Sequence, residues 1–143
     1  MEKSFIEINY TKKDSFIHFN EDIKKYLIKN KSKKIVYITD YIYPITKPQK
    51  DSYEIIDHIN LSGFNPLKGP SFISLTNAYK SKKGIVVAHL KEDVQPNPYE
   101  IKILLKSNIK AYCYNLVPTV IFAVSLGFKI KAFGVIKTWQ TLL

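Results

Sequence analysis

The sequence predicts one α/β domain built on a mixed, largely parallel sheet flanked by helices. Apolar β-branched and aromatic runs alternate along the chain with segments of helical periodicity, the pattern of strands connected by helices. With 143 residues the chain can bury one substantial core and is too short for two. No internal repeat or shift in composition divides it, so the domain is expected to span residues 1–143.

Strands are predicted wherever apolar residues alternate with polar ones or form short dense runs. Alternation at 5–10 and again at 15–19 favours an early hairpin, because polar residues separate the two segments. The denser runs that predict further strands lie at 35–39, 53–59, 84–90, 111–114 and 129–136. We expect 35–39, 53–59, 84–90 and 129–136 to share one sheet.

Helices are predicted from the residues that begin them. Asn20 can cap a helix that ends near Asn30, because its side chain accepts hydrogen bonds from the free N–H groups of a first turn. Asn97 and Pro98 begin a second helix, and Pro118 begins a third that reaches Gly127. A short helical turn is expected around 76–79.

The first residues lack an apolar segment of the secretory type, so we expect a cytoplasmic protein without a membrane span. The one cysteine, Cys113, agrees with a reducing compartment and is expected to be a small core residue. His18, His58 and His89 have no metal-like spacing, so structural histidines are expected, with no metal and no cofactor.

The net charge of +10 comes entirely from lysine, because the sequence contains no arginine. Arginine is the usual residue for bidentate phosphate and guanine contacts, so its absence argues against an arginine-based phosphate site. The simplest explanation of this composition is an AT-rich genome, whose codons favour lysine. The lysine clusters at Lys31–Lys34 and Lys80–Lys83 lack interleaved aromatic residues, and a nucleic-acid partner is therefore not expected.

The segment from Asp57 to Pro70 resembles the strand-and-loop signature of the trimeric purine nucleoside phosphorylases. The alignment extends, with gaps, over residues 33–138. The likeness continues through Thr76–Tyr79, Gly84–Leu90, Pro98–Lys102 and Val117–Val120. The resemblance implies a phosphorylase-type α/β fold, a purine base or nucleoside as ligand, and a homo-oligomer with contacts around Phe64–Phe72.

The positions that carry chemistry in that family are altered here. The purine-reading glutamate aligns with Pro96, and Gln95 stands where an aromatic residue flanks the base. The asparagine that supports charge on the purine aligns with Thr138, which Lys137 precedes. Tyr114-Asn115 stands where the family has a Met-Ser pair beneath the ribose and phosphate. Phe72 aligns with a phenylalanine that, in the family, reaches into the purine pocket of a neighbouring subunit. In this chain Phe72 either has that role or anchors the long loop.

The family's glycine-rich phosphate loop and its C-terminal histidine helix have no counterpart in this sequence. Phosphorolysis needs an oriented phosphate dianion, which backbone N–H groups and positive charge normally hold. Asp93, in the loop after the strand at 84–90, is a replacement candidate for reading a purine edge, although a solvated loop acid is the simpler interpretation.

The leading hypothesis is a purine nucleoside phosphorylase-like pseudoenzyme that binds a nucleoside or oligomerises. The first alternative is an active phosphorylase whose remodelled site uses Asp93, Asn115 and Thr138, with phosphate as co-substrate. The second alternative is a lysine-rich binder of polyanions or nucleic acid, for which affinity should fall steeply with salt.

Overall fold

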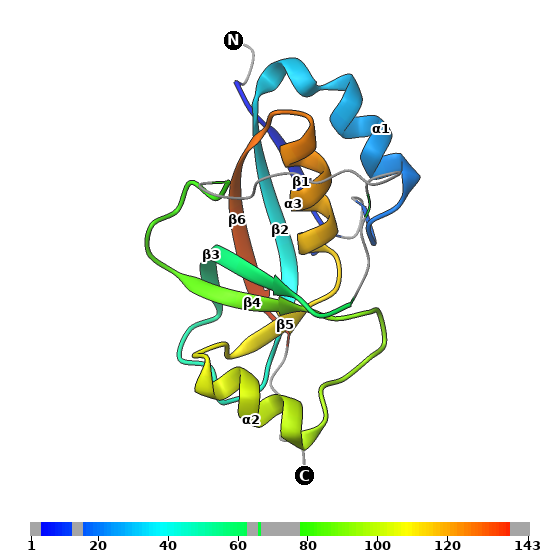
Figure 1. Ribbon diagram of the computed structural model, residues 1–143. Helices are drawn as coiled ribbons and strands as arrows, with labels where there is room; N and C mark the ends of the chain where they lie inside the picture. Colours follow the sequence, from blue (N-terminus) through cyan, green and yellow to red (C-terminus); the bar gives the residue numbers. More distant parts are fainter. Residues whose placement is uncertain (1–3, 13–15, 63–65, 67–77, 138–143) are drawn as a thin grey trace.

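The computed structural model describes residues 4–12, 16–62, 66 and 78–137 (Figure 1). The early hairpin segment at residue 15, the turn residues 76–77, and the site candidates Phe72 and Thr138 lie outside these ranges, as does most of the loop at 64–72. The described strands are β1 (Ile6–Asn9), β2 (Ile35–Pro44), β3 (Ser52–Asn60), β4 (Ile85–His89), β5 (Ala111–Cys113) and β6 (Lys129–Ile136). The described helices are α1 (Glu21–Lys29), α2 (Pro98–Lys106) and α3 (Leu116–Ser125), with a 3₁₀ turn at Lys31–Lys33.

Five of these strands close into a barrel, and β1 extends the sheet at one edge. Around the barrel, β2 pairs with β6 in parallel, β6 with β3 antiparallel, β3 with β4 and β4 with β5 in parallel, and β5 with β2 antiparallel. β1 runs parallel to the first half of β2. The mixed α/β class and the shared sheet are therefore confirmed. A largely parallel sheet is not, because the antiparallel pairs at β3–β6 and β2–β5 are the ones that close the barrel.

The core follows from the alternation of side chains along β2. Val36, Ile38 and Ile42 are fully buried, and they pack in one cluster with Leu116 and Val120 of α3. Figure 1 shows α3 lying across β2 and β6, with α1 beside it. A second, smaller cluster joins Leu104 of α2 to β4 and β5, so that α2 covers another side of the barrel.

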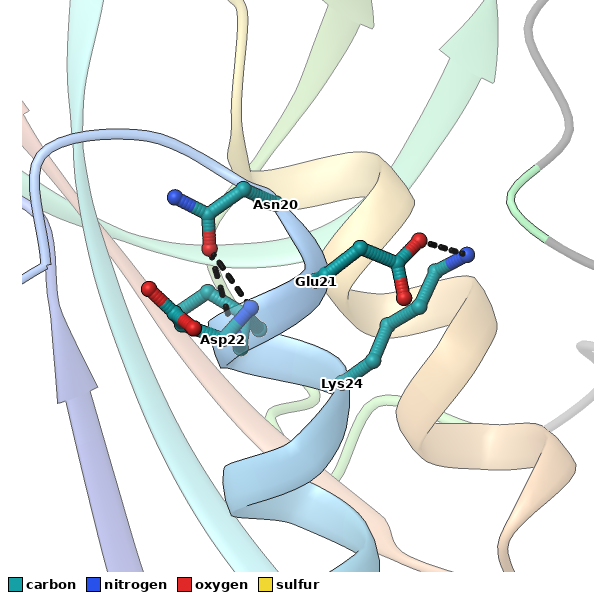
Figure 2. A network of polar contacts seen from close by, with 5 residues as sticks. Asn20, Glu21, Asp22 and Lys24 are labelled. Atoms are coloured by element: carbon teal, nitrogen blue, oxygen red, sulfur yellow. Dashed lines mark hydrogen bonds and ion pairs between the residues drawn. The ribbon is translucent and has the colours of Figure 1, made fainter.

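Local signals at the helix starts account for two of the helices. The side chain of Asn20 accepts hydrogen bonds from the N–H groups of Asp22 and Ile23, at 2.9 and 3.3 Å, and Glu21 pairs with Lys24 at 3.3 Å (Figure 2). Asn97 and Glu100 form a reciprocal capping box at the start of α2. Both helices begin where the sequence predicts.

The predicted strand at 15–19 is wrong in its described part, since residues 16–19 form no strand. Phe16 and Phe19 instead pack against the core from a loop, and the N–H of Phe19 donates to Asn115 Oδ1 at 3.1 Å. Aromatic anchors spaced along a loop produced the alternation that resembled a strand. The turn expected at 76–79 is likewise absent at Tyr79, which forms a single bridge to Ile130.

Two further boundaries differ from the prediction. β2 continues through the residues expected to form a loop, as far as Pro44, and α3 begins at Leu116 rather than at Pro118. Cys113 is fully buried, as predicted. Among the described residues, no helix has the length and apolar character needed to cross a membrane.

Candidate functional site

One edge of β2 changes its pairing partner, and the candidate site lies at that change. The edge pairs with β1 from Val36 to Thr39 and with β5 from Tyr43 to Pro44. Asp40 lies between the two partners. Because β5 leads directly into α3, the start of that helix also reaches this position. Ligands in α/β folds commonly bind where strand order changes in this way.

Two adjoining cavities, of about 360 and 270 Å³, occupy this region. They share Glu92, Tyr114 and Asn115, and we refer to them together as the β2–β5 cleft. The larger cavity also contacts Phe19, Ser62, His89, Lys91 and Pro118, and the smaller one contacts Tyr10, Ile17, His18, Asp40, Tyr41, Tyr43 and Asp93.

Asp40 is a buried carboxylate bound to the start of α3. Only 2% of the residue is exposed. Its Oδ2 accepts hydrogen bonds from the N–H groups of Asn115 and Leu116, at 3.0 and 2.9 Å, and its Oδ1 accepts from Tyr41 N–H at 2.8 Å. Burial raises the pKa of Asp40 to about 6, against the opposing effect of these hydrogen bonds. At neutral pH the helix start therefore already holds an anion, one supplied by the chain itself.

A chain of hydrogen bonds holds the wall next to Asp40 in place. The hydroxyl of Thr119 donates to Asn115 O at 2.7 Å, and the hydroxyl of Tyr10 contacts Thr119 Oγ1 at 2.5 Å. Burial raises the pKa of Tyr10, so its hydroxyl stays neutral and can donate. Asn115 also holds Phe19 through its side-chain oxygen. Asn115 thus joins α3, the loop before α1 and the cleft.

Three tyrosines pack together along the β2–β5 pairing. The ring centroids of Tyr43 and Tyr112 are 5.3 Å apart and stacked, and those of Tyr43 and Tyr114 are 5.1 Å apart. The Tyr114 hydroxyl donates to Val94 O at 3.0 Å, which ties the loop after β4 to the cleft. Burial is the main cause that raises the pKa of all three phenols. They act as neutral rings with hydrogen-bonding tips.

Two of the histidines have defined partners. His89 is nearly buried at the end of β4, where its Nδ1 lies 3.3 Å from Cys113 O, and burial lowers its pKa. A neutral ring with Nδ1–H donating to that carbonyl leaves Nε2 as an acceptor at the cavity that His89 lines. His58 instead pairs through Nδ1 with the hydroxyl of Tyr79 at 2.7 Å and lines neither cavity.

The structure brings some of the sequence-predicted site residues together. Asp93, Tyr114 and Asn115 all line the smaller cavity, with Asp93 in a left-handed conformation at φ 66°. Gln95 and Pro96 lie in the loop before α2 and line neither part of the cleft as the described residues define it. Lys137 follows β6, and its Nζ lies 4.3 Å from the centroid of the Tyr41 ring.

Asp40, Tyr10 and Tyr43 were not singled out from the sequence. The sequence pattern does indicate that Asp40 is buried. Position 40 falls on the same alternating face of β2 as the buried Val36, Ile38 and Ile42. An acid in the apolar phase of a strand is a buried charge, and buried charges require partners. The partners themselves, 75 residues further along the chain, could not be read from that pattern.

No protein-family model and no curated protein matches the sequence. Solved structures do match. A Schistosoma purine nucleoside phosphorylase in complex with hypoxanthine superposes with a TM-score of 0.65 at 21% identity, over 77% of this chain and 52% of that one. Isoform 2 of the Schistosoma mansoni enzyme, in complex with cytosine and ribose-1-phosphate, superposes with a TM-score of 0.69 at 25% identity, over 83% of this chain and 53% of that one.

A third match, the Schistosoma enzyme in complex with guanosine, gives a TM-score of 0.74 at 16% identity over 98% of this chain and 81% of that one. In the first two comparisons this chain spans about half the length of the enzyme it matches. The comparisons agree with the resemblance carried by Asp57–Pro70 and its neighbouring motifs. The chain has the fold of the purine nucleoside phosphorylases.

Proposed function

We propose that this chain binds a purine base or nucleoside in the β2–β5 cleft and does not phosphorolyse it. The observation that carries the proposal is the Asp40 carboxylate, which occupies the N–H groups at the start of α3 beside an aromatic cavity. The cavity favours an uncharged ring, and the carboxylate disfavours phosphate.

The cleft offers contacts that suit a heteroaromatic ligand. The Tyr114 ring supplies a surface on which a base can stack. Glu92 and Asn115 supply hydrogen-bonding groups at the same cavity, and a volume of about 360 Å³ is within the usual range for small-molecule sites. The related structures contain hypoxanthine and guanosine, which makes purines the first ligands to test.

Phosphate binding is opposed by both geometry and charge. A helix start binds a dianion through free N–H groups, and here Asp40 Oδ2 accepts from two of them. Glu92 and Asp93 add two more carboxylates to the cleft lining. Among the described lining residues, Lys91 is the lysine that opposes them. An oriented phosphate nucleophile would have to displace Asp40 and overcome this repulsion.

The first alternative keeps one supporting observation, since Asp93 and Asn115 line the same cavity. An active enzyme would then read the purine with Asp93 instead of the aligned Pro96. Phosphate-dependent release of hypoxanthine from inosine separates the two proposals. We expect no hypoxanthine release. Turnover near one per second that stops when phosphate is omitted would overturn the proposal that the chain binds purines without phosphorolysis.

Ligand binding is tested by thermal unfolding with hypoxanthine, inosine, guanosine or phosphate. A ligand at about 100 times its dissociation constant adds about 2.7 kcal/mol. For a chain of this size that raises Tm by roughly 5–10 °C. We expect a purine compound to give this shift and phosphate alone to give none.

The variant Tyr114→Ala should abolish the purine shift. Tyr99→Ala is the matched control, because Tyr99 is 77% exposed on α2 and lines neither cavity. Purine binding that survives Tyr114→Ala unchanged would place the ligand outside the cleft.

A further inference from the structure

Three aromatic rings from separate segments form a row on the outer face of the sheet. Phe5 precedes β1, Tyr37 lies in β2 and Phe133 in β6. The ring centroids of Phe5 and Tyr37 are 4.5 Å apart, and those of Tyr37 and Phe133 are 6.2 Å apart. All three residues are half-buried, so part of each remains accessible.

This row lies on the face of β2 and β6 opposite to α3. Successive residues of a strand point to opposite faces. Val36, Ile38 and Ile130 are fully buried in the cluster that contains α3, so Tyr37 and Phe133 face the other way. Among the described elements, α3 is the helix with substantial packing against β2 and β6 (Figure 1).

Lysines from three segments meet beside the aromatic row. Lys129 alternates with the buried Ile130 and therefore shares the outer face with Phe133. The N–H of Lys129 donates to Lys34 O at 2.8 Å, and the N–H of Lys80 donates to Ile130 O at 2.7 Å. Lys34, Lys80 and Lys129 are all exposed. The two lysine clusters of the sequence thus flank the start of β6, with Lys34 on the β2 side and Lys80 on the opposite edge.

Two acids lie on the same face. Glu7 is the register partner of Tyr37, and Glu54 is the register partner of Phe133. Glu54 also pairs with Lys131 at 3.3 Å, and that lysine is therefore partly neutralised. The lysines Lys34, Lys80, Lys129 and Lys131 outnumber these two acids, so the described part of the surface keeps a net positive charge.

We propose that this surface, the aromatic–lysine face (Tyr37, Phe133, Lys34, Lys80 and Lys129), binds single-stranded nucleic acid. Bases can stack on aromatic side chains whatever their identity, while lysines along the same surface contact the phosphates. A duplex hides its base faces, so exposed rings favour a single strand. An acidic peptide would use the lysines and leave the rings without a role. Lysine lacks the planar fork that reads guanine, and binding is therefore tolerant of sequence.

The test is fluorescence anisotropy with labelled oligothymidylate of about 12 nucleotides, a length within the usual site range. An abasic strand of the same length carries the same phosphates without bases. The wild-type chain should bind oligothymidylate about tenfold or more tightly than the abasic strand, the effect of losing base stacking.

Two sets of variants separate stacking from charge. Tyr37→Leu and Phe133→Leu keep apolar volume, and each should weaken binding of oligothymidylate by roughly 5- to 100-fold without affecting the abasic strand. The double variant Lys34→Gln with Lys129→Gln should make the negative slope of log K against log salt shallower by roughly 1.4. Each phosphate contact on a single strand contributes about 0.7 to that slope. The control is Lys102→Gln with Lys106→Gln, two exposed lysines of α2, which should change neither.

The proposal is overturned if the wild-type chain does not bind at low salt, or if the abasic strand binds equally well. It is also overturned if the α2 control weakens binding as much as the double variant, or if polyglutamate of equal charge competes as well as the oligonucleotide. Circular dichroism checks the fold of each variant. If Phe133→Leu does not fold, Tyr37→Leu and the abasic strand decide the outcome.

Discussion

Replacing Asp40 with asparagine should remove a pH dependence of stability that the wild-type chain has. Burial raises the pKa of Asp40 from 3.8 to about 6. The folded chain then holds this proton more tightly than the unfolded chain, so the contribution of Asp40 to stability is greatest below about pH 4 and is lost as pH rises to about 6. A shift of about 2 units corresponds to about 3 kcal/mol lost across that window.

The hydrogen bonds of Asp40 set the size of the opposing effect. An asparagine oxygen at the Oδ2 position can still accept from Asn115 and Leu116, but the amide nitrogen then faces the N–H of Tyr41. Leaving that donor without an acceptor costs about 1–3 kcal/mol at every pH. Asp40→Asn should therefore be less stable than wild type at pH 4 and about equally stable, or more stable, at pH 7.

Urea unfolding at a series of pH values between 4 and 7.5 measures this difference. Other carboxylates titrate in both proteins, so they largely cancel when the two curves are subtracted. Asp51→Asn, at an exposed position, is the matched control and should run parallel to wild type. Parallel curves for Asp40→Asn and wild type would refute the assignment of a raised pKa to this carboxyl.

Three further outcomes follow from the structure. Asp40→Ala frees the N–H groups of Asn115 and Leu116, so phosphate should raise the Tm of this variant and not that of wild type; equal shifts in thermal unfolding would contradict the role given to the carboxylate. Pro96→Glu combined with Thr138→Asn should not produce hypoxanthine release from inosine, because neither change supplies a phosphate site. Phosphate-dependent turnover by the double variant would contradict this reasoning. Light scattering at micromolar concentration should detect a homo-oligomer, for which the exposed Ile59 and Leu61 at the start of the loop toward Phe64–Phe72 are apolar contact candidates, and a monomer alone would exclude it.

Elements with a strong local cause could be predicted from the sequence. Asn20 and the Asn97–Glu100 capping box mark the starts of α1 and α2, because a side chain satisfies the N–H groups of its own first turn. The run at Lys129–Ile136 matches β6 residue for residue. Tyr114 and Asn115 lie in the cleft because they follow β5 and precede α3, an order that the chain itself determines.

The tertiary structure alone decided which distant segments pair. Closure of the barrel depends on Tyr43 opposite Tyr112 and Glu54 opposite Phe133, contacts whose register no local periodicity specifies. The same dependence applies to Asp40, whose partners come from the start of α3. It applies also to the row of Phe5, Tyr37 and Phe133, aromatic residues that come into contact only because β1, β2 and β6 lie side by side. Periodicity along a chain reports which face of an element is apolar, whereas function here depends on which faces meet, and long-range packing determines that.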